Sequence, residues 1–112
     1  MRAIVTFIGM LLLLNPAVGL FISLADWERM SESQQGIYIA GAFDSLVSFS
    51  TSDDDTKTNQ HYHSCVIRSR MTNVQLARKV RAFAAAKPEI HATSVQVALG
   101  QYLFAVCGKP PS

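Results

Sequence analysis

The chain has 112 residues, nearly half of them hydrophobic, with ten Lys and Arg against eight Asp and Glu. A net charge of +2 argues against a protein that binds nucleic acid, because the phosphates attract many Lys and Arg side chains. The length allows one domain with a small core and leaves no room for a second.

The first segment has the features of a secretory signal peptide. Arg2 precedes a short apolar run at residues 3–14, and Pro16 then leads into small residues. A positive start, an apolar centre and a small-x-small cleavage motif define such a signal. We expect residues 1–19 to be removed, although a second motif at residues 23–25 allows a later cut. A retained membrane anchor is the alternative, but a spanning helix needs about 20 apolar residues and Pro16 interrupts this run.

Export places the mature chain, residues 20–112, across a membrane, with a net charge of about +1 once Arg2 is removed. Cys65 and Cys107 are its only cysteines. In an oxidising compartment two such cysteines normally pair, so we predict a Cys65–Cys107 disulfide. Closing a loop of about 43 residues would contribute about 4 kcal/mol in the chain-entropy account.

Capping motifs and apolar periodicity predict an all-α fold. A short helical segment is expected at residues 26–30, and a capping box that begins at Ser31 starts a helix over residues 32–49. A glycine inside that helix, Gly41, predicts a close crossing with another helix. A second capping box, at Thr72, starts a helix over residues 73–86.

The last predicted helix covers residues 89–106, because Pro88 suits a first helical turn. Residues 50–64 are polar and lack apolar periodicity, so we expect a loop there. The prediction is a small single-domain bundle of three main helices plus a short N-terminal helical segment. The apolar stripe of the last helix is expected to consist of Val95, Leu99, Tyr102 and Val106. An aromatic core is expected to include Trp27, Tyr38, Phe43 and Tyr102.

The string His61-x-His63-x-Cys65 is the most metal-like pattern in the sequence. Zinc binds imidazole and thiolate groups. However, alternate positions of an extended loop rarely converge on one ion, and Cys65 is expected in the disulfide. We therefore predict no metal and no other cofactor.

The sequence also lacks a catalytic set. No serine lies in a G-x-S-x-G elbow, and the even cysteine count leaves no thiol nucleophile. The acidic run at residues 53–55 lacks the D-x-[DN]-x-[DN]-G pattern of a calcium loop. These features favour a non-enzyme.

A longer pattern runs from Trp27 to the last cysteine in the order Trp…Tyr-x-x-Gly-x-x-Asp…Cys…Cys, where the middle part is Tyr38, Gly41 and Asp44. This order resembles the Rap/Tai family of small helical periplasmic proteins, which includes immunity proteins of type VI secretion systems. The resemblance covers residues 27–107. It implies a periplasmic immunity-type protein that binds and inhibits a secreted peptidoglycan amidase effector.

Two other functions stay open. An acid-stress periplasmic chaperone of the HdeA type is also small, helical and bridged by one disulfide, and His61, His63 and His91 would give it some sensitivity to protons. An adaptor subunit of an envelope complex is the other alternative.

If the protein binds a partner, the polar loop is the expected contact, because loops held by a rigid frame often carry binding function. Contact with the membrane is expected only during export, and the sequence leaves the oligomeric state open, a homodimer included. The candidate partner-binding residues are Asp53, Asp54, Asp55, His61 and His63.

Overall fold

A computed structural model describes residues 22–111, so the expected signal peptide lies outside the described residues. The regular secondary structure of this part of the chain is helical, apart from one isolated antiparallel bridge between Ser23 and Ser94. The all-α prediction is confirmed. Among residues 22–111, none of the helices combines the length and the hydrophobicity that a membrane crossing requires.

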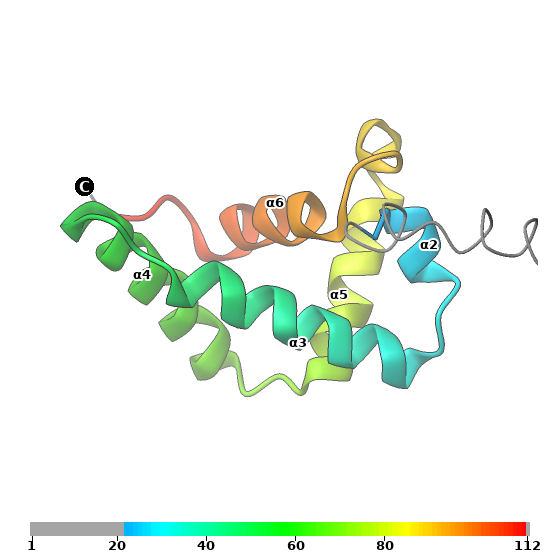
Figure 1. Cartoon of the computed structure of the whole chain (residues 1–112), viewed down its shortest axis with the longest axis horizontal. Helices are drawn as coiled ribbons and strands as arrows, with labels where there is room; N and C mark the ends of the chain where they lie inside the picture. Colours follow the sequence, from blue (N-terminus) through cyan, green and yellow to red (C-terminus); the bar gives the residue numbers. More distant parts are fainter. Residues whose placement is uncertain (1–21, 112) are drawn as a thin grey trace, which may run out of the picture.

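The described residues form five α-helices and one short 3-10 helix (Figure 1). The longest helix, α3, packs against α4, α5 and α6, and α5 crosses it steeply near its first turns. The segment after α6 contacts α4, where Nε2 of His61 lies 3.0 Å from the carbonyl oxygen of Gly108. In chain order the elements are α2 (Leu24–Glu28), α3 (Glu32–Ser48), α4 (Asp53–Ser69), α5 (Asn73–Ala85), η2 (Pro88–Ile90) and α6 (Val95–Cys107).

Two helices begin where the capping boxes predict. At the start of α3, the Ser31 hydroxyl accepts from the Gln34 N–H at 3.2 Å, and the Gln34 side-chain oxygen accepts from the Ser31 N–H at 3.3 Å. Thr72 and Gln75 make the same reciprocal pair at the start of α5, over 3.1 and 2.9 Å. Each pair satisfies two backbone N–H groups that a helix start leaves free.

The predicted loop at residues 50–64 is wrong, because most of it folds into α4. Ser52 caps this helix, with its hydroxyl accepting from the Asp55 N–H at 3.1 Å. The carboxylates in the first turn also stabilise the helix, because they lie at the positive end of its dipole. The apolar pattern is weak because Val66 is the only buried residue of α4. The bundle therefore has four main helices instead of three.

The last helix begins later than predicted, at Val95. Pro88–Ile90 forms a separate 3-10 turn, and Ser94 caps α6 by accepting a hydrogen bond from the Val97 N–H at 3.3 Å. Three of the four predicted stripe residues are buried, but Val106 is 54% exposed.

The predicted aromatic core is confirmed. Trp27 is fully buried, Phe43 and Tyr102 are each 6% exposed, and Tyr38 packs against the edge of the same cluster. All main helices contribute to this core, so the short α2 is anchored to the bundle through Trp27.

The Cys65–Cys107 disulfide is present, with a Cα–Cα distance of 5.9 Å. Cys65 lies within α4 and not just past a loop, so the bridge joins α4 to the last residue of α6.

The expected helix crossing at Gly41 is also wrong. A Cβ built at Gly41 would meet no atom within 4 Å. The close approach is one and a half turns earlier, where a Cβ at Gly36 would lie 3.0 Å from Asn73 Nδ2 and from Val74 Cγ2. Gly36 therefore lets the start of α5 contact the backbone of α3.

Candidate functional site

The three predicted acidic residues form the exposed first turn of α4. Asp55 is part of the helix start, because one of its carboxylate oxygens accepts from the N–H and the hydroxyl of Thr51 at 3.2 and 2.8 Å. These hydrogen bonds lower the pKa of the Asp55 carboxyl group. The side chains of Asp53 and Asp54 make no ion pair with a described residue, so they can contact a partner.

The two predicted histidines lie on different sides of α4. Residues two apart in a helix are separated by about 200° around its axis. Nε2 of His61 lies 3.0 Å from the carbonyl oxygen of Gly108, whereas the ring of His63 stacks near Phe43 with centroids 6.3 Å apart. Because Cys65 is in the disulfide, these three side chains do not offer one ion a common set of ligands.

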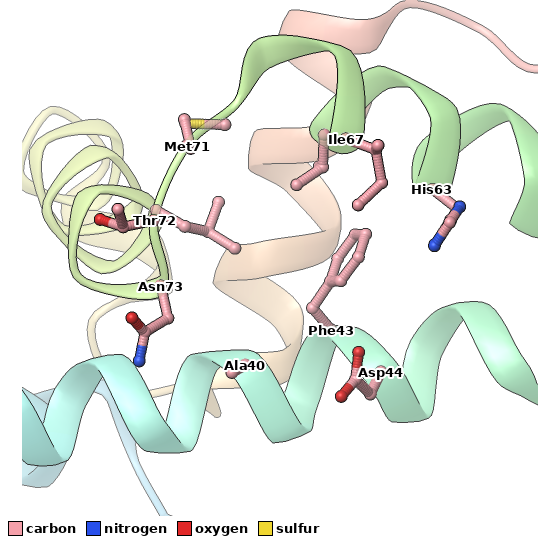
Figure 2. A pocket seen from close by; sticks show the side chains of 10 residues that line it. Ala40, Phe43, Asp44, His63, Ile67, Met71, Thr72 and Asn73 are labelled. Atoms are coloured by element: carbon pink, nitrogen blue, oxygen red, sulfur yellow. The ribbon is translucent and has the colours of Figure 1, made fainter.

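His63 borders a groove of about 170 Å³ between α3, the second half of α4 and the start of α5 (Figure 2). Phe43, Val66 and Leu76 line it and belong to the hydrophobic core. Ile67 also lines the groove and is 58% exposed. An apolar surface of this size suits one inserted side chain.

Polar groups from all three helices stand at the edge of this groove: Asp44 from α3, His63 from α4, and Thr72 and Asn73 at the start of α5 (Figure 2). The hydroxyl of Thr72 is already used by the helix cap. The carboxylate of Asp44 forms no ion pair within residues 22–111 and is exposed. The groove thus combines an apolar surface with a few orienting polar groups, the usual composition of a recognition site.

The sequence identifies His63 as a candidate, whereas Asp44 appears only in the Tyr-x-x-Gly-x-x-Asp pattern. It could not bring them together, because that requires α4 to be a helix packed on α3. The other predicted site residues are outside this groove: the acidic turn at the start of α4, and His61 on the side of α4 that faces the C-terminal segment.

An ion pair outside the groove fixes α3 against α5. The guanidinium of Arg78 donates to the two carboxylate oxygens of Glu32 at 2.7 and 3.0 Å, and Arg81 lies 3.5 Å from one of them. The hydrogen bonds from Arg78, together with the charges of both arginines, lower the pKa of Glu32 to about 2. The pair links the first turn of α3 to the middle of α5.

The surface carries several large hydrophobic side chains that no described residue covers. Monomeric proteins rarely expose contiguous apolar patches beyond a few hundred Å², and larger patches often mark interaction sites. The exposed side chains come from three helices and one connection: Ile37, Phe49, Ile67, Val97, Phe104 and Val106.

Comparison with protein-family models, with curated proteins and with solved structures finds no match for this chain.

Proposed function

We propose that this chain is a periplasmic immunity-type protein that binds and inhibits a secreted peptidoglycan amidase effector. The resemblance to the Rap/Tai family supports the role. The observation that carries it is the groove between α3, α4 and α5, where an exposed apolar side chain, Ile67, adjoins the polar groups of Asp44 and His63. Such a surface suits the insertion of an effector side chain.

The exposed side of α4 extends this surface beyond the groove. At 100° per residue, Asp53, His63 and Ile67 fall within a sector of about 80° around the helix, along about 21 Å of its axis. A protein interface of ordinary size covers about 800 Å² per partner, enough to include all three side chains. An effector bound on this side would contact both the acidic first turn and the groove.

The frame that holds α4 supports a rigid binding mode. The disulfide ties α4 to α6, and Ser52 fixes where α4 begins. Groups that are already ordered lose less conformational entropy on binding, so affinity rises. This arrangement suits an inhibitor that must block a cleft without being displaced.

We also propose that the mature chain begins at Leu20. Ser23 caps α2 by accepting from the Asp26 N–H at 3.1 Å. Leu24 is fully buried, and its N–H donates to the carbonyl oxygen of Thr93 at 2.9 Å. A cut after residue 25 would remove both contributions to the fold. The intact mass of the exported protein tests this proposal, and a chain that starts at Asp26 would contradict it.

Inhibition of purified peptidoglycan amidases by the mature chain tests the main proposal. Ile67→Glu is expected to weaken inhibition at least about tenfold, because it puts a charge into the apolar lining of the groove. Ile37→Glu is the matched control, since Ile37 is similarly exposed, at 66% against 58%, but lies outside the groove. Equal inhibition by the two variants would contradict the assignment of the groove.

An HdeA-type acid chaperone is the second candidate, and the ion pair of Glu32 is the observation in its favour. With the pKa of Glu32 near 2, protonation in strong acid would release Arg78 and Arg81 and loosen the contact between α3 and α5. Protection of unfolded client proteins in strong acid, together with no amidase binding at neutral pH, would favour this candidate.

A further inference from the structure

Helix α6 carries more hydrophobic surface than the core covers. Val95, Leu99 and Leu103 are fully buried, whereas Val97 and Phe104, on the opposite side of the helix, are 41% and 56% exposed. A helix that is hydrophobic all round is normally covered all round. The hydrophobic side chains on the outer side of α6 are therefore not covered by any described residue.

A groove of about 450 Å³ runs between this side of α6 and the neighbouring helices α4 and α5. Three aromatic side chains line it, each from a different helix: Tyr62 from α4, Phe83 from α5 and Phe104 from α6. Aromatic rings favour edge-to-face or offset contacts with other rings. Such a lining suits an inserted aromatic side chain.

Gly100, in the middle of α6, also lines the groove. A glycine inside a helix lowers stability relative to alanine. A Cβ at this position would meet no atom within 4 Å, so no packing within the described chain requires the glycine. Its effect is to leave open space beside Phe104, where a bound side chain can approach the backbone of α6.

Lys87 is the one charged residue among the described residues that line this groove. Its ammonium group lies 5.2 Å from the centre of the Phe83 ring, and none of the ion pairs within residues 22–111 includes it. A cation without a carboxylate partner, next to an apolar surface, attracts a carboxylate.

We propose that the groove between α4, α5 and α6 binds an aromatic side chain of the effector that adjoins an Asp or Glu residue in its sequence. The aromatic ring enters beside Gly100 between Phe83 and Phe104, and the carboxylate pairs with Lys87. This inference rests on the proposed function, because it names a second contact with the same protein partner.

A pair of capped dipeptides tests the recognition directly: acetyl-Phe-Glu-amide and acetyl-Phe-Gln-amide. Each is titrated into the folded, disulfide-bonded mature protein while the backbone amide resonances are recorded by NMR. We expect saturable shifts at Tyr62, Gly100 and Gln101, with tighter binding of the peptide that contains Glu. Absent or non-saturable shifts at these residues would overturn the proposal, as would equal binding of the two peptides.

Gly100→Leu fills the open space and is expected to abolish the saturable shifts. The matched control is Gly41→Leu, because Gly41 is also a helical glycine whose added Cβ would meet no atom within 4 Å, and it lies outside the groove. Both variants should fold, since each replaces a helical glycine by a stronger helix former. Lys87→Gln should remove the preference for Glu over Gln while retaining binding of the ring.

Failure of this inference is distinguishable from failure of the proposed function. If an amidase is inhibited equally by the wild type and by Gly100→Leu, the second contact is overturned and the proposed function stands. If the dipeptide binds but no amidase does, the proposed function fails and the chemistry of the groove stands. Self-association that Gly100→Leu abolishes, with no shift from either peptide, would assign the groove to a second copy of this chain and overturn the proposal.

Discussion

The indole Nε1 of Trp27 donates a hydrogen bond to the main-chain oxygen of Gln35 at 3.2 Å, which ties α2 to the first turns of α3. Gln35 is 3% exposed, the one buried polar residue among those described. Its side-chain amide donates to the carbonyl oxygens of Glu28 and Met30 at 3.1 and 2.9 Å, and the guanidinium of Arg81 donates to its side-chain oxygen. One residue thus links α2, α3 and α5, and its buried polar atoms are satisfied.

Trp27→Ala should lower the free energy of unfolding by about 3–5 kcal/mol, because it empties a fully buried site and removes the hydrogen bond to Gln35. Urea denaturation followed by circular dichroism measures the change. Trp27→Phe is the control, since it keeps an aromatic ring in the core but loses the N–H donor. It should cost less than the alanine variant. An unchanged urea midpoint for Trp27→Ala would mean that the indole does not anchor α2.

Glu32 should make stability depend on pH in the acid range. Its pKa is about 2 in the folded chain, against an ordinary value of 4.5, chiefly because Arg78 donates hydrogen bonds to the carboxylate. The unfolded chain binds the proton first as the pH falls, so the contribution of Glu32 is present above about pH 4.5 and is lost on the way down to about pH 2.

Urea midpoints of the wild type and Glu32→Gln, recorded from neutral pH down to about pH 2, test this linkage. The two proteins should differ above pH 4.5 and converge in strong acid. Glu89→Gln is the control, because Glu89 is exposed and forms no ion pair within the described residues. A difference between wild type and Glu32→Gln that persists at the lowest pH would contradict the role of the ion pair.

The disulfide should account for a large share of the stability of so small a domain. Cys107→Ser is expected to lower the free energy of unfolding by about 4 kcal/mol, because the unfolded chain is no longer closed between residues 65 and 107. Reduction of the wild type should produce a similar loss in the urea midpoint. Alkylation of periplasmic protein before reduction provides a second readout. Two modified cysteines there would contradict the bond.

Arg70 ends α4 in a left-handed conformation, with φ 56° and ψ 28°, and its N–H donates to the carbonyl oxygen of Ile67. Glycine adopts this conformation without steric cost, so Arg70→Gly should stabilise the protein by about 0.5–1 kcal/mol. Arg68→Gly is the matched control. It lies within the last turn of α4 and should destabilise by a similar amount. A lower melting temperature for Arg70→Gly would contradict the assignment of strain at this position.

Helices α3 and α5 could be predicted because the signals that start them are local. In each, a hydroxyl and an amide three residues apart satisfy the first N–H groups. Helix α4 has neither a capping box nor an apolar stripe along one side, and Val66 is its only buried residue. Its anchor is a bond to Cys107, 42 residues away, and no local pattern shows such a contact. One local signal could have predicted the start of α4. Ser52 can cap a helix, and the three acidic residues after it stabilise the positive end of the helix dipole.

The candidate site depends on α4, the helix that the sequence analysis did not predict. His63 was a candidate partner-binding residue and Asp44 was part of the Tyr-x-x-Gly-x-x-Asp pattern, but the groove between them exists only when α4 packs on α3. The two glycines of α3 show the same limit. Gly36 and Gly41 look alike in sequence, and only the position of α5 shows that Gly36 is the residue at the crossing.

Protection of living cells tests the central claim most directly. A peptidoglycan amidase effector is directed to the periplasm of cells that also produce this chain, either with residues 1–19 or without them, and lysis is followed over time. We predict that the exported, disulfide-bonded protein prevents lysis and that the chain retained in the cytoplasm does not. Continued lysis in the presence of the folded periplasmic protein, across the amidase effectors tested, would contradict the account.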